Sequence, residues 1–178
     1  MSVPSQGSVT AFVAVGSNIN PEHNILGALD RLKRFVNVRA TSRFFRARPI
    51  ERLDQPMFIN GVWKILSIQG ARALKFEVLR RIETELGRKR TRDRHASRTI
   101  DLDLILYGDE VINEPELHVP DLDIYRRAFV AVPLMELAPK LRVPGSLKPI
   151  SSLPAAQLGD GLISLPKFSE QLKQRLMQ

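Results

Sequence analysis

Short apolar runs alternate with amphipathic stretches over the first part of the chain. Residues 10–15 (TAFVAV) are apolar and partly β-branched, which predicts a buried strand that stops at Gly16-Ser17-Asn18. Asn20 is placed to cap a helix that has Pro21 at its first position. Apolar residues follow at helical spacing and give this helix one buried face: Ile25, Leu29, Leu32 and Phe35. The pattern therefore predicts a strand followed by a helix.

The same alternation continues to residue 107. Val38–Arg46 indicates a strand, and Asp54-Gln55-Pro56 indicates a loop. The next strand is predicted over 58–68, with one side formed by Phe58, Asn60, Val62, Lys64 and Leu66. A helix between Gly70 and Gly87 has an apolar face of Leu74, Val78, Ile82 and Leu86. Thr99–Tyr107 (TIDLDLILY) is the clearest strand in the chain.

The last third is less regular. Pro133 interrupts the apolar run from Phe129 to Leu137, which argues against one long helix there. Residues 144–166 are rich in Pro, Gly and Ser and predict an irregular loop, and residues 168–177 predict a short terminal helix. We expect one domain over residues 1–178, with a core of about 9–143. Two β-α-β-like halves indicate an α+β fold, a ferredoxin-like α/β sandwich around a mainly antiparallel sheet.

Composition narrows the function classes. The 178 residues include 27 basic and 19 acidic residues, a formal charge of +8, which suits a polyanionic partner such as nucleic acid, anionic lipid or a phosphorylated small molecule. The absence of cysteine excludes disulfides, thiolate zinc sites and a cysteine nucleophile. No apolar run approaches the ~20 residues of a spanning helix, and the first residues (MSVPSQGSV) do not form a signal peptide. We expect a cytoplasmic protein with no membrane partner.

The segment Arg94–Ile105 contains the most informative chemistry. On a strand, Asp101 and Asp103 point the same way, about 6.6 Å apart. The opposite face then holds the apolar residues Ile100, Leu102, Leu104 and Leu106. Paired carboxylates without a nearby His or Cys cluster suit Mg²⁺ when phosphate oxygens complete its coordination shell. The alternative to a metal site is that the two aspartates simply line the solvent-facing side of the strand. In either case, replacing one aspartate is expected to cost little stability.

A basic run directly precedes these acids and consists of Arg88, Lys89, Arg90, Arg92, Arg94 and Arg98. Such runs are commonly solvated or bind nucleic acid, so a basic ferredoxin-like RNA-binding module is one alternative. Against it, aromatic residues make up only 6% of the chain and no base-stacking motif is present. Cations beside a metal site instead suit a triphosphate. A Walker A loop is missing, so the nucleotide is held in another way.

From about Val13 to Pro139, the chain resembles the 6-hydroxymethyl-7,8-dihydropterin pyrophosphokinase (HPPK) family. The resemblance rests on R-T-I-D-L-D at 98–103 and D-Q-P-x-F-x-N at 54–60, in that family's order. It also includes Gly16-Ser17-Asn18, ETELGR at 83–88 and Arg127-Ala128-Phe129. It implies transfer of pyrophosphate from ATP to the pterin hydroxymethyl group, with release of AMP, in folate biosynthesis. The implied partners are ATP and a dihydropterin, without nucleic acid, for a monomer or weak homodimer.

The resemblance also implies roles for individual residues. Asp101 and Asp103 would hold two Mg²⁺ ions, and with Arg88 and Arg98 they would form the catalytic set. ATP would contact Arg88, Arg90, Arg98 and Arg127. The pterin would contact Asn60, Phe58 and Phe129, although both phenylalanines could instead be ordinary core residues.

The chain departs from the family pattern at three places. His95 stands where the family usually has Trp, and we expect it to cover the pterin over a smaller area. Asp121 stands where the family usually has a nucleotide-binding His, and we predict that His118 substitutes for it. Ala47-Arg48 replaces a Thr-Pro pair before Pro49. These departures leave an alternative interpretation, in which the chain is a diverged relative that uses another pterin or another phosphate donor.

Overall fold

The computed structural model describes residues 7–50, 54–89, 93, 96–159 and 161–178. A six-stranded sheet lies at its centre, in the order β5-β1-β4-β3-β8, with β2 also paired to β4. Every pairing in this sheet is antiparallel. Its strands are β1 (Val9–Ser17), β2 (Asn37–Thr41), β3 (Phe45–Ala47), β4 (Phe58–Ser67), β5 (Asp101–Tyr107) and β8 (Ile163–Ser164). A separate hairpin pairs β6 (Ile112–Glu114) with β7 (Leu117–Val119).

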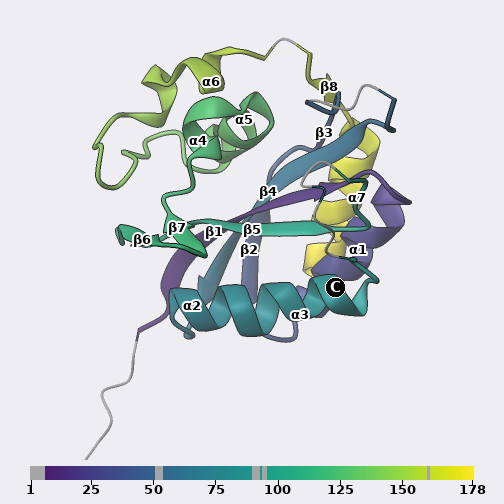
Figure 1. The fold of residues 1–178 in the computed structure, drawn as a ribbon, viewed down its shortest axis with the longest axis horizontal. Helices are drawn as coiled ribbons and strands as arrows, with labels where there is room; N and C mark the ends of the chain where they lie inside the picture. Colours follow the sequence, from purple (N-terminus) through teal and green to yellow (C-terminus); the bar gives the residue numbers. More distant parts are fainter. Residues whose placement is uncertain (1–6, 51–53, 90–92, 94–95, 160) are drawn as a thin grey trace, which may run out of the picture.

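Helices cover both faces of the sheet (Figure 1). One layer contains α1 (Pro21–Leu32), α7 (Pro166–Met177) and a continuous helical stretch that begins as α2 (Ala71–Ala73), passes through the π-helical turn η1 (Leu74–Leu79) and ends as α3 (Arg80–Glu85). The other layer contains α4 (Asp123–Arg126), α5 (Ala128–Leu137), the 3₁₀ turn η2 (Ile150–Ser152) and α6 (Pro154–Gln157). The sheet order and the crossing helices confirm the expected ferredoxin-like α+β arrangement.

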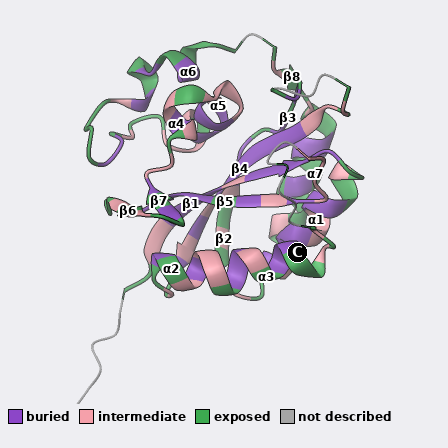
Figure 2. Ribbon diagram, viewed as in Figure 1, coloured by how far each residue is buried: buried purple, intermediate pink, exposed green. Residues whose placement is uncertain are grey.

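Each face of the sheet has its own hydrophobic cluster. Buried residues accordingly lie on the strands and on the helices that cover them (Figure 2). Trp63 and Ile65 of β4 pack with Leu29 of α1 on one face, whereas Val62 packs with Leu134 of α5 on the other. Burial of each such side chain contributes about 1.5–3 kcal/mol. The alternation along β4 therefore places the side of Phe58, Asn60 and Val62 under the second helix layer, as its sequence predicts.

An extra residue in β5 corrects one prediction. Val13 of β1 pairs with Leu104, but Phe12 pairs with Leu106, so Ile105 has no partner on β1. A bulge of this kind reverses the alternation of the residues after it. Leu106 consequently lies in the second cluster rather than on the face of Leu104, where strict alternation had placed it.

The turn from β1 into α1 also differs from expectation. Strand β1 continues through Gly16 to Ser17 rather than stopping before them. Asn20 adopts a left-handed conformation (φ 40°), and its side chain forms no capping hydrogen bond. Asn tolerates this conformation better than most residues. The Asn24 amide supplies a substitute contact by donating to the Ile19 carbonyl at 2.6 Å.

The last third is more ordered than its composition suggests. Helix α5 runs uninterrupted through Pro133, contrary to the prediction. A proline inside a helix costs about 3 kcal/mol, and burial of Val130 and Leu134 on the same helix offsets a cost of this size. The predicted irregular loop at 144–166 contains η2 and α6, whose apolar residues pack in the second cluster, and the short strand β8, which pairs with β3. The predicted terminal helix is α7, which begins at Pro166. Within the described residues, no helix is long and apolar enough to cross a membrane.

Candidate functional site

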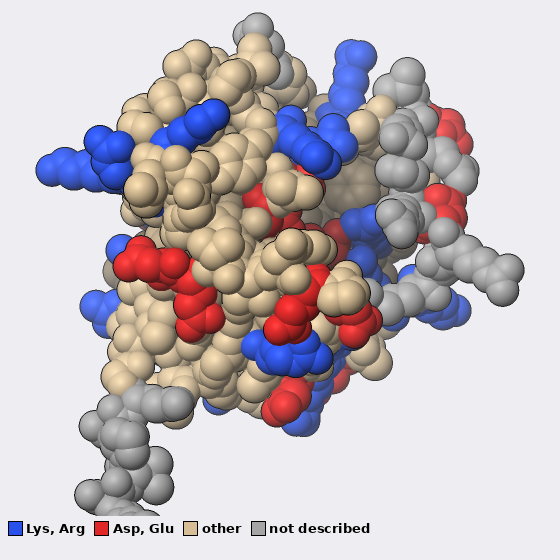
Figure 3. Space-filling view, turned by 60° about the vertical axis from the view of Figure 1, so that its left-hand side comes forward, with Lys and Arg blue, Asp and Glu red and all other residues tan. Residues whose placement is uncertain are grey.

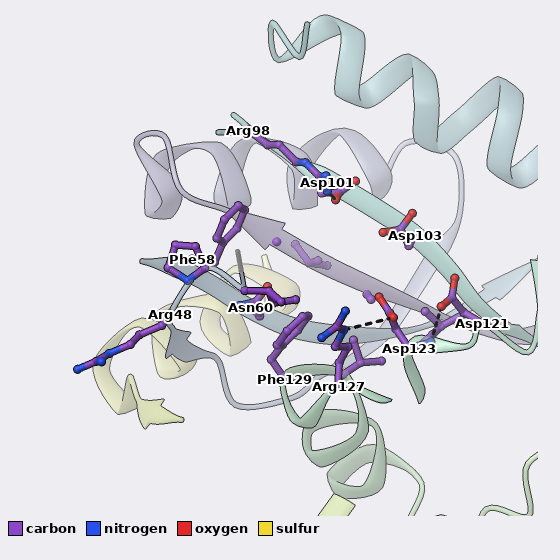
Figure 4. Close-up of a pocket in the computed structure, with 18 of the residues that line it drawn as sticks. Arg48, Phe58, Asn60, Arg98, Asp101, Asp103, Asp121, Asp123, Arg127 and Phe129 are labelled. Atoms are coloured by element: carbon purple, nitrogen blue, oxygen red, sulfur yellow. Dashed lines mark hydrogen bonds and ion pairs between the residues drawn. The ribbon is translucent and has the colours of Figure 1, made fainter. Parts of the chain in front are cut away.

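A cavity of about 240 Å³ lies where β1, β4 and β5 meet α4 and α5. At the surface it forms a hollow with acidic side chains in its floor and basic side chains around its margin (Figure 3). Polar and aromatic residues from separate parts of the chain line it: Arg48, Phe58, Asn60, Arg98, Asp101, Asp103, Asp121, Asp123, Arg127 and Phe129 (Figure 4). Most of the residues predicted from the sequence are therefore brought together in one place.

Small residues of β1 form the floor of this cavity. Gly16 pairs with Asn60 on β4 and with Asp101 on β5, so these three residues form one row across the sheet. Ala14 pairs in the same way with Asp103. A Cβ atom at Gly16 would lie 2.9 Å from Oδ1 of Asn60, which is too close for an ordinary contact. The glycine thus leaves open the space between the amide and the first acid.

Asp101 and Asp103 both line the cavity, so their predicted common side is confirmed. Their surroundings differ. Asp101 is paired with Arg88 and Arg98, and only 14% of its side chain is exposed. Asp103 forms no ion pair with any described residue and opens into the cavity. Removal from bulk water and the negative charges of Asp101, Asp121 and Glu83 raise the pKa of the Asp103 carboxyl well above its ordinary value. A cation bound beside Asp103 would favour the ionised carboxylate.

Arg88 lies behind the cavity rather than in its lining. Its guanidinium bridges Asp101 and the buried carboxylate of Glu83, and its side chain is 13% exposed. Glu83 also accepts a hydrogen bond from the Leu102 backbone N–H at 2.9 Å, which ties α3 to β5. Glu83 belongs to the ETELGR segment, but its helical pattern alone did not indicate a site residue. In this structure Arg88 supports Asp101 from behind.

The segment after β7 forms the opposite wall. Asp121 accepts a hydrogen bond from the Asp123 backbone N–H at 2.8 Å, and Nε of Arg127 lies 3.6 Å from Oδ1 of Asp123. Burial raises the pKa of Asp121, and the Asp123 charge adds to the effect. Sequence reasoning missed Asp123, although Asp121-Leu122-Asp123 repeats the D-L-D of the strand. His118 is exposed on β7 and does not line this cavity.

Asn60 lies between two aromatic rings. Phe58 and Phe129 flank it in the cavity (Figure 4), and both are only partly buried. Asn60 itself is 7% exposed, and none of the described residues forms a hydrogen bond with its side chain. Buried amides normally find partners, so this amide is available to a planar polar ligand held between the rings.

Two predicted site residues, Arg90 and His95, lie outside the described residues. Arg48 lines the cavity, but its guanidinium extends away from the acids (Figure 4). The departure at Ala47-Arg48 thus affects the margin of the cavity rather than its acidic floor.

The donor set fits a hard divalent cation. Asp101 and Asp103 offer carboxylate oxygens, and Asp103 forms no ion pair with the residues that the structure describes. Within the part of the chain that the structure describes, no group of three or more His, Cys, Asp or Glu residues could enclose a metal ion. Mg²⁺ binds readily through one or two carboxylates, with water and phosphate oxygens as its other ligands. The cavity therefore fits a cation that arrives with a phosphorylated ligand.

Comparisons with known proteins agree with this chemistry. The sequence model of the 7,8-dihydro-6-hydroxymethylpterin-pyrophosphokinase (HPPK) family matches residues 12–139. The chain is 41% identical over 141 residues to the 2-amino-4-hydroxy-6-hydroxymethyldihydropteridine pyrophosphokinase of Haemophilus influenzae, covering 78% of this chain and 87% of that protein. It is 39% identical over 158 residues to the protein of the same name from Pseudomonas aeruginosa, covering 87% and 96%.

Solved structures support the fold. Wild-type Plasmodium falciparum HPPK-DHPS, crystallised with pterin and p-hydroxybenzoate, matches with a TM-score of 0.64 at 10% identity. A triple mutant of the same protein with pteroate matches with a TM-score of 0.65 at 11% identity, over 95% of this chain and 45% of that chain. The chain thus spans about half the length of these structures, and the likeness concerns the fold.

Proposed function

Since the chain belongs to the HPPK family, we propose that the cavity is the site at which this enzyme transfers pyrophosphate from ATP to 6-hydroxymethyl-7,8-dihydropterin. The transfer releases AMP and is a step of folate biosynthesis. One observation carries the placement: Asp101, Asp103 and Asn60 lie on one face of the sheet and line the same cavity. The two acids at one end of this row suit the charged triphosphate, and Asn60 at the other end suits the planar pterin.

The reaction needs alignment more than covalent catalysis. The hydroxymethyl oxygen forms a bond to the β-phosphorus, the bond from that phosphorus to the α–β bridging oxygen breaks, and AMP leaves with this oxygen. The hydroxyl proton is lost during the transfer. Holding the two reactants in line can contribute on the order of 7–11 kcal/mol to lowering the barrier. The described residues serve mainly to bind and orient.

At the triphosphate end, Asp101 and Asp103 would hold Mg²⁺, which supplies neutralisation of phosphate charge. We assign two ions, as the resemblance implies. Among the described residues, four aspartates and three arginines line the cavity, so a triphosphate placed beside the acids would be repelled by them unless a cation lay between. Arg98 lies beside Asp101, and its guanidinium can turn from that carboxylate to phosphate oxygens. Arg88 holds Asp101 in place, and Arg127 on the opposite wall would contact the nucleotide.

At the pterin end, the Asn60 amide offers both a donor and an acceptor to the edge of the ring. Phe58 and Phe129 would lie along its faces, where an aromatic contact contributes about 0.5–1.5 kcal/mol beyond burial. Gly16 leaves the space through which the hydroxymethyl group reaches the triphosphate. The assignments of Arg90 and His118 to ATP and of His95 to the pterin remain proposals. So do a cytoplasmic location and a monomer or weak homodimer.

The test is AMP release, measured with ATP and Mg²⁺ in the presence of the dihydropterin and then without it. We expect AMP only when both substrates are present. Asp103→Asn should lower the rate on the order of 10²–10³-fold, because the cation that neutralises the developing phosphate charge would lose one of its carboxylate ligands. Asp109→Asn is the matched control, since Asp109 is an exposed acid in the turn after β5. Full activity of Asp103→Asn would contradict the metal placement, and AMP release without the pterin would contradict the pterin as acceptor.

A further inference from the structure

The three residues that follow Gly16 hold the backbone of Arg98. The Arg98 carbonyl accepts hydrogen bonds from the backbone N–H groups of Asn18 at 3.1 Å and of Ile19 at 3.2 Å. The Ser17 hydroxyl donates to the neighbouring Thr99 carbonyl at 2.6 Å. The end of β1 is therefore fastened to the residue that carries the guanidinium at the triphosphate end of the cavity.

The side chain of Asn18 extends this connection to a third segment. Its Oδ1 accepts the Arg98 backbone N–H at 2.7 Å, and its Nδ2 donates to the Ser97 hydroxyl at 3.2 Å and to the Pro56 carbonyl at 3.3 Å. Pro56 lies two residues before Phe58, which lines the pterin end. Asn18 is 4% exposed and does not line the cavity itself. One buried amide thus joins the segments that lead to the two ends of the site.

The identity of these partners explains why the residue is asparagine. A backbone N–H can only donate and a backbone carbonyl can only accept, so the two ends of the amide have fixed positions. An ionised aspartate would keep the acceptor for Arg98 but offer no donor to Pro56. A serine would be too short to reach both segments. Alanine would leave the Arg98 N–H and the Pro56 carbonyl without this partner in a largely buried place.

We propose that Asn18 is a positioning residue that couples the two substrates, because its amide sets the place of Arg98 relative to the segment that leads into Phe58. The inference rests on the proposed function, in particular on Arg98 at the triphosphate. Displacing a catalytic group by about 1 Å can lower a rate on the order of 10²-fold. Loss of the amide therefore lowers kcat and removes the effect of bound nucleotide on pterin affinity, whereas pterin binding to the nucleotide-free protein changes little because Asn18 does not contact the pterin.

The experiment compares Asn18→Ala with Ser169→Ala in kcat, both KM values and thermal stability. Ser169 is equally buried, and its hydroxyl accepts the Phe44 N–H at 2.8 Å in the other helix layer. The same hydroxyl donates to the Leu165 carbonyl at 2.8 Å, so Ser169→Ala is a matched loss of buried polar contacts away from the cavity. We expect a kcat lower on the order of 10²-fold for Asn18→Ala, with the dissociation constant of the dihydropterin in the absence of nucleotide within about threefold. Ser169→Ala should keep the kcat of the parent protein.

Binding gives a second readout that a purely structural role would not change. The dissociation constant of the dihydropterin is measured by calorimetry with and without a non-hydrolysable ATP analogue and Mg²⁺. Coupled sites change each other's affinity by the same factor, so we expect the analogue to tighten pterin binding in the parent protein. This factor should fall towards one in Asn18→Ala. Its absence in the parent protein, or its persistence in the variant, would overturn the proposal.

Two further variants distinguish a wrong coupling role for Asn18 from a wrong proposed function. Ser97→Ala removes a single hydrogen bond of the amide and keeps the test available if Asn18→Ala does not fold; we expect a loss in kcat of roughly 2–10-fold. Arg98→Ala tests the proposed function itself. If Arg98→Ala loses activity while Asn18→Ala and Ser97→Ala keep it, the coupling role is wrong and the site stands. If Arg98→Ala keeps full activity, the placement of the triphosphate is wrong.

Discussion

The two acids of β5 are predicted to differ in their effect on stability, although they share a strand face. Asn has the shape of Asp without the charge, so Asp101→Asn and Asp103→Asn isolate the electrostatic contribution of each. From the sequence alone, both substitutions are expected to cost little stability. The structure separates them, because Asp101 is neutralised by two arginines and Asp103 by none of the described residues.

The magnitude follows from these contacts. Asp101 makes two charge-assisted contacts, each worth about 1.5–3 kcal/mol against about 0.5–1.5 kcal/mol for a neutral one. Its partners are mostly enclosed, with 13% of Arg88 and 28% of Arg98 exposed. Asp101→Asn is therefore expected to lower the free energy of unfolding by about 2–3 kcal/mol. For a chain of this size the melting temperature would fall by roughly 4–12 °C.

Asp103→Asn is expected to leave stability unchanged or to raise it. The raised pKa means that the folded protein holds the Asp103 proton more tightly than the unfolded chain does. Ionisation of Asp103 then costs stability as the pH rises through that raised pKa, and costs nothing below its ordinary value near 3.8. The advantage of Asp103→Asn should accordingly be present at neutral pH and disappear in acid.

The assay is thermal or urea unfolding of both variants and the parent protein without divalent cations, over a series of pH values, together with AMP release. Both variants should lose activity, but only Asp101→Asn should lose stability at neutral pH. Equal destabilisation by the two substitutions would refute the reasoning. So would an advantage of Asp103→Asn that grows as the pH falls.

Three further predictions concern the ligands. Gly16→Ala should raise KM for the dihydropterin on the order of 10-fold, since its Cβ would lie 2.9 Å from Oδ1 of Asn60 and about 1.4 kcal/mol of lost binding is tenfold. Gly70→Ala is the control, because a Cβ at Gly70 meets nothing within 4 Å. An unchanged KM in Gly16→Ala would contradict the role of Gly16. ATP should raise the melting temperature only together with Mg²⁺, because a ligand stabilises only when it binds the folded state; an equal rise with ATP and EDTA, or with an RNA oligonucleotide, would count against the site. His118→Ala should weaken ATP binding if this exposed residue replaces the missing histidine, and an unchanged dissociation constant would remove that assignment.

Local patterns in the sequence were sufficient for the framework of the site. Alternation along β4 and β5 placed Asn60 and the two acids on the correct faces, since a strand buried on one side has only one workable register. The parts that sequence could not supply depend on contacts between distant segments. Arg88 forms ion pairs with Asp101 and Glu83, which its place in a basic run did not indicate, and the partners of Asn18 lie 38 and about 80 positions away. Helix α5 likewise continues through Pro133 because packing against other segments stabilises it, and this packing cannot be seen in its own sequence.

The unpaired Ile105 has a consequence for how β5 can change over evolution. Deleting this residue would let Leu106 follow Leu104 directly in the ladder, so Leu106 and Tyr107 would keep their partners on β1, their faces and the hydrogen bond from the Tyr107 hydroxyl to the Gln69 carbonyl. The pairs that Gly16 and Ala14 make with Asp101 and Asp103 lie on the other side of the bulge and would keep their register. Evolution can therefore remove or restore this residue without disturbing the register of either half of the strand. What such a change would alter is the cavity wall and the second cluster, to which Ile105 contributes its side chain.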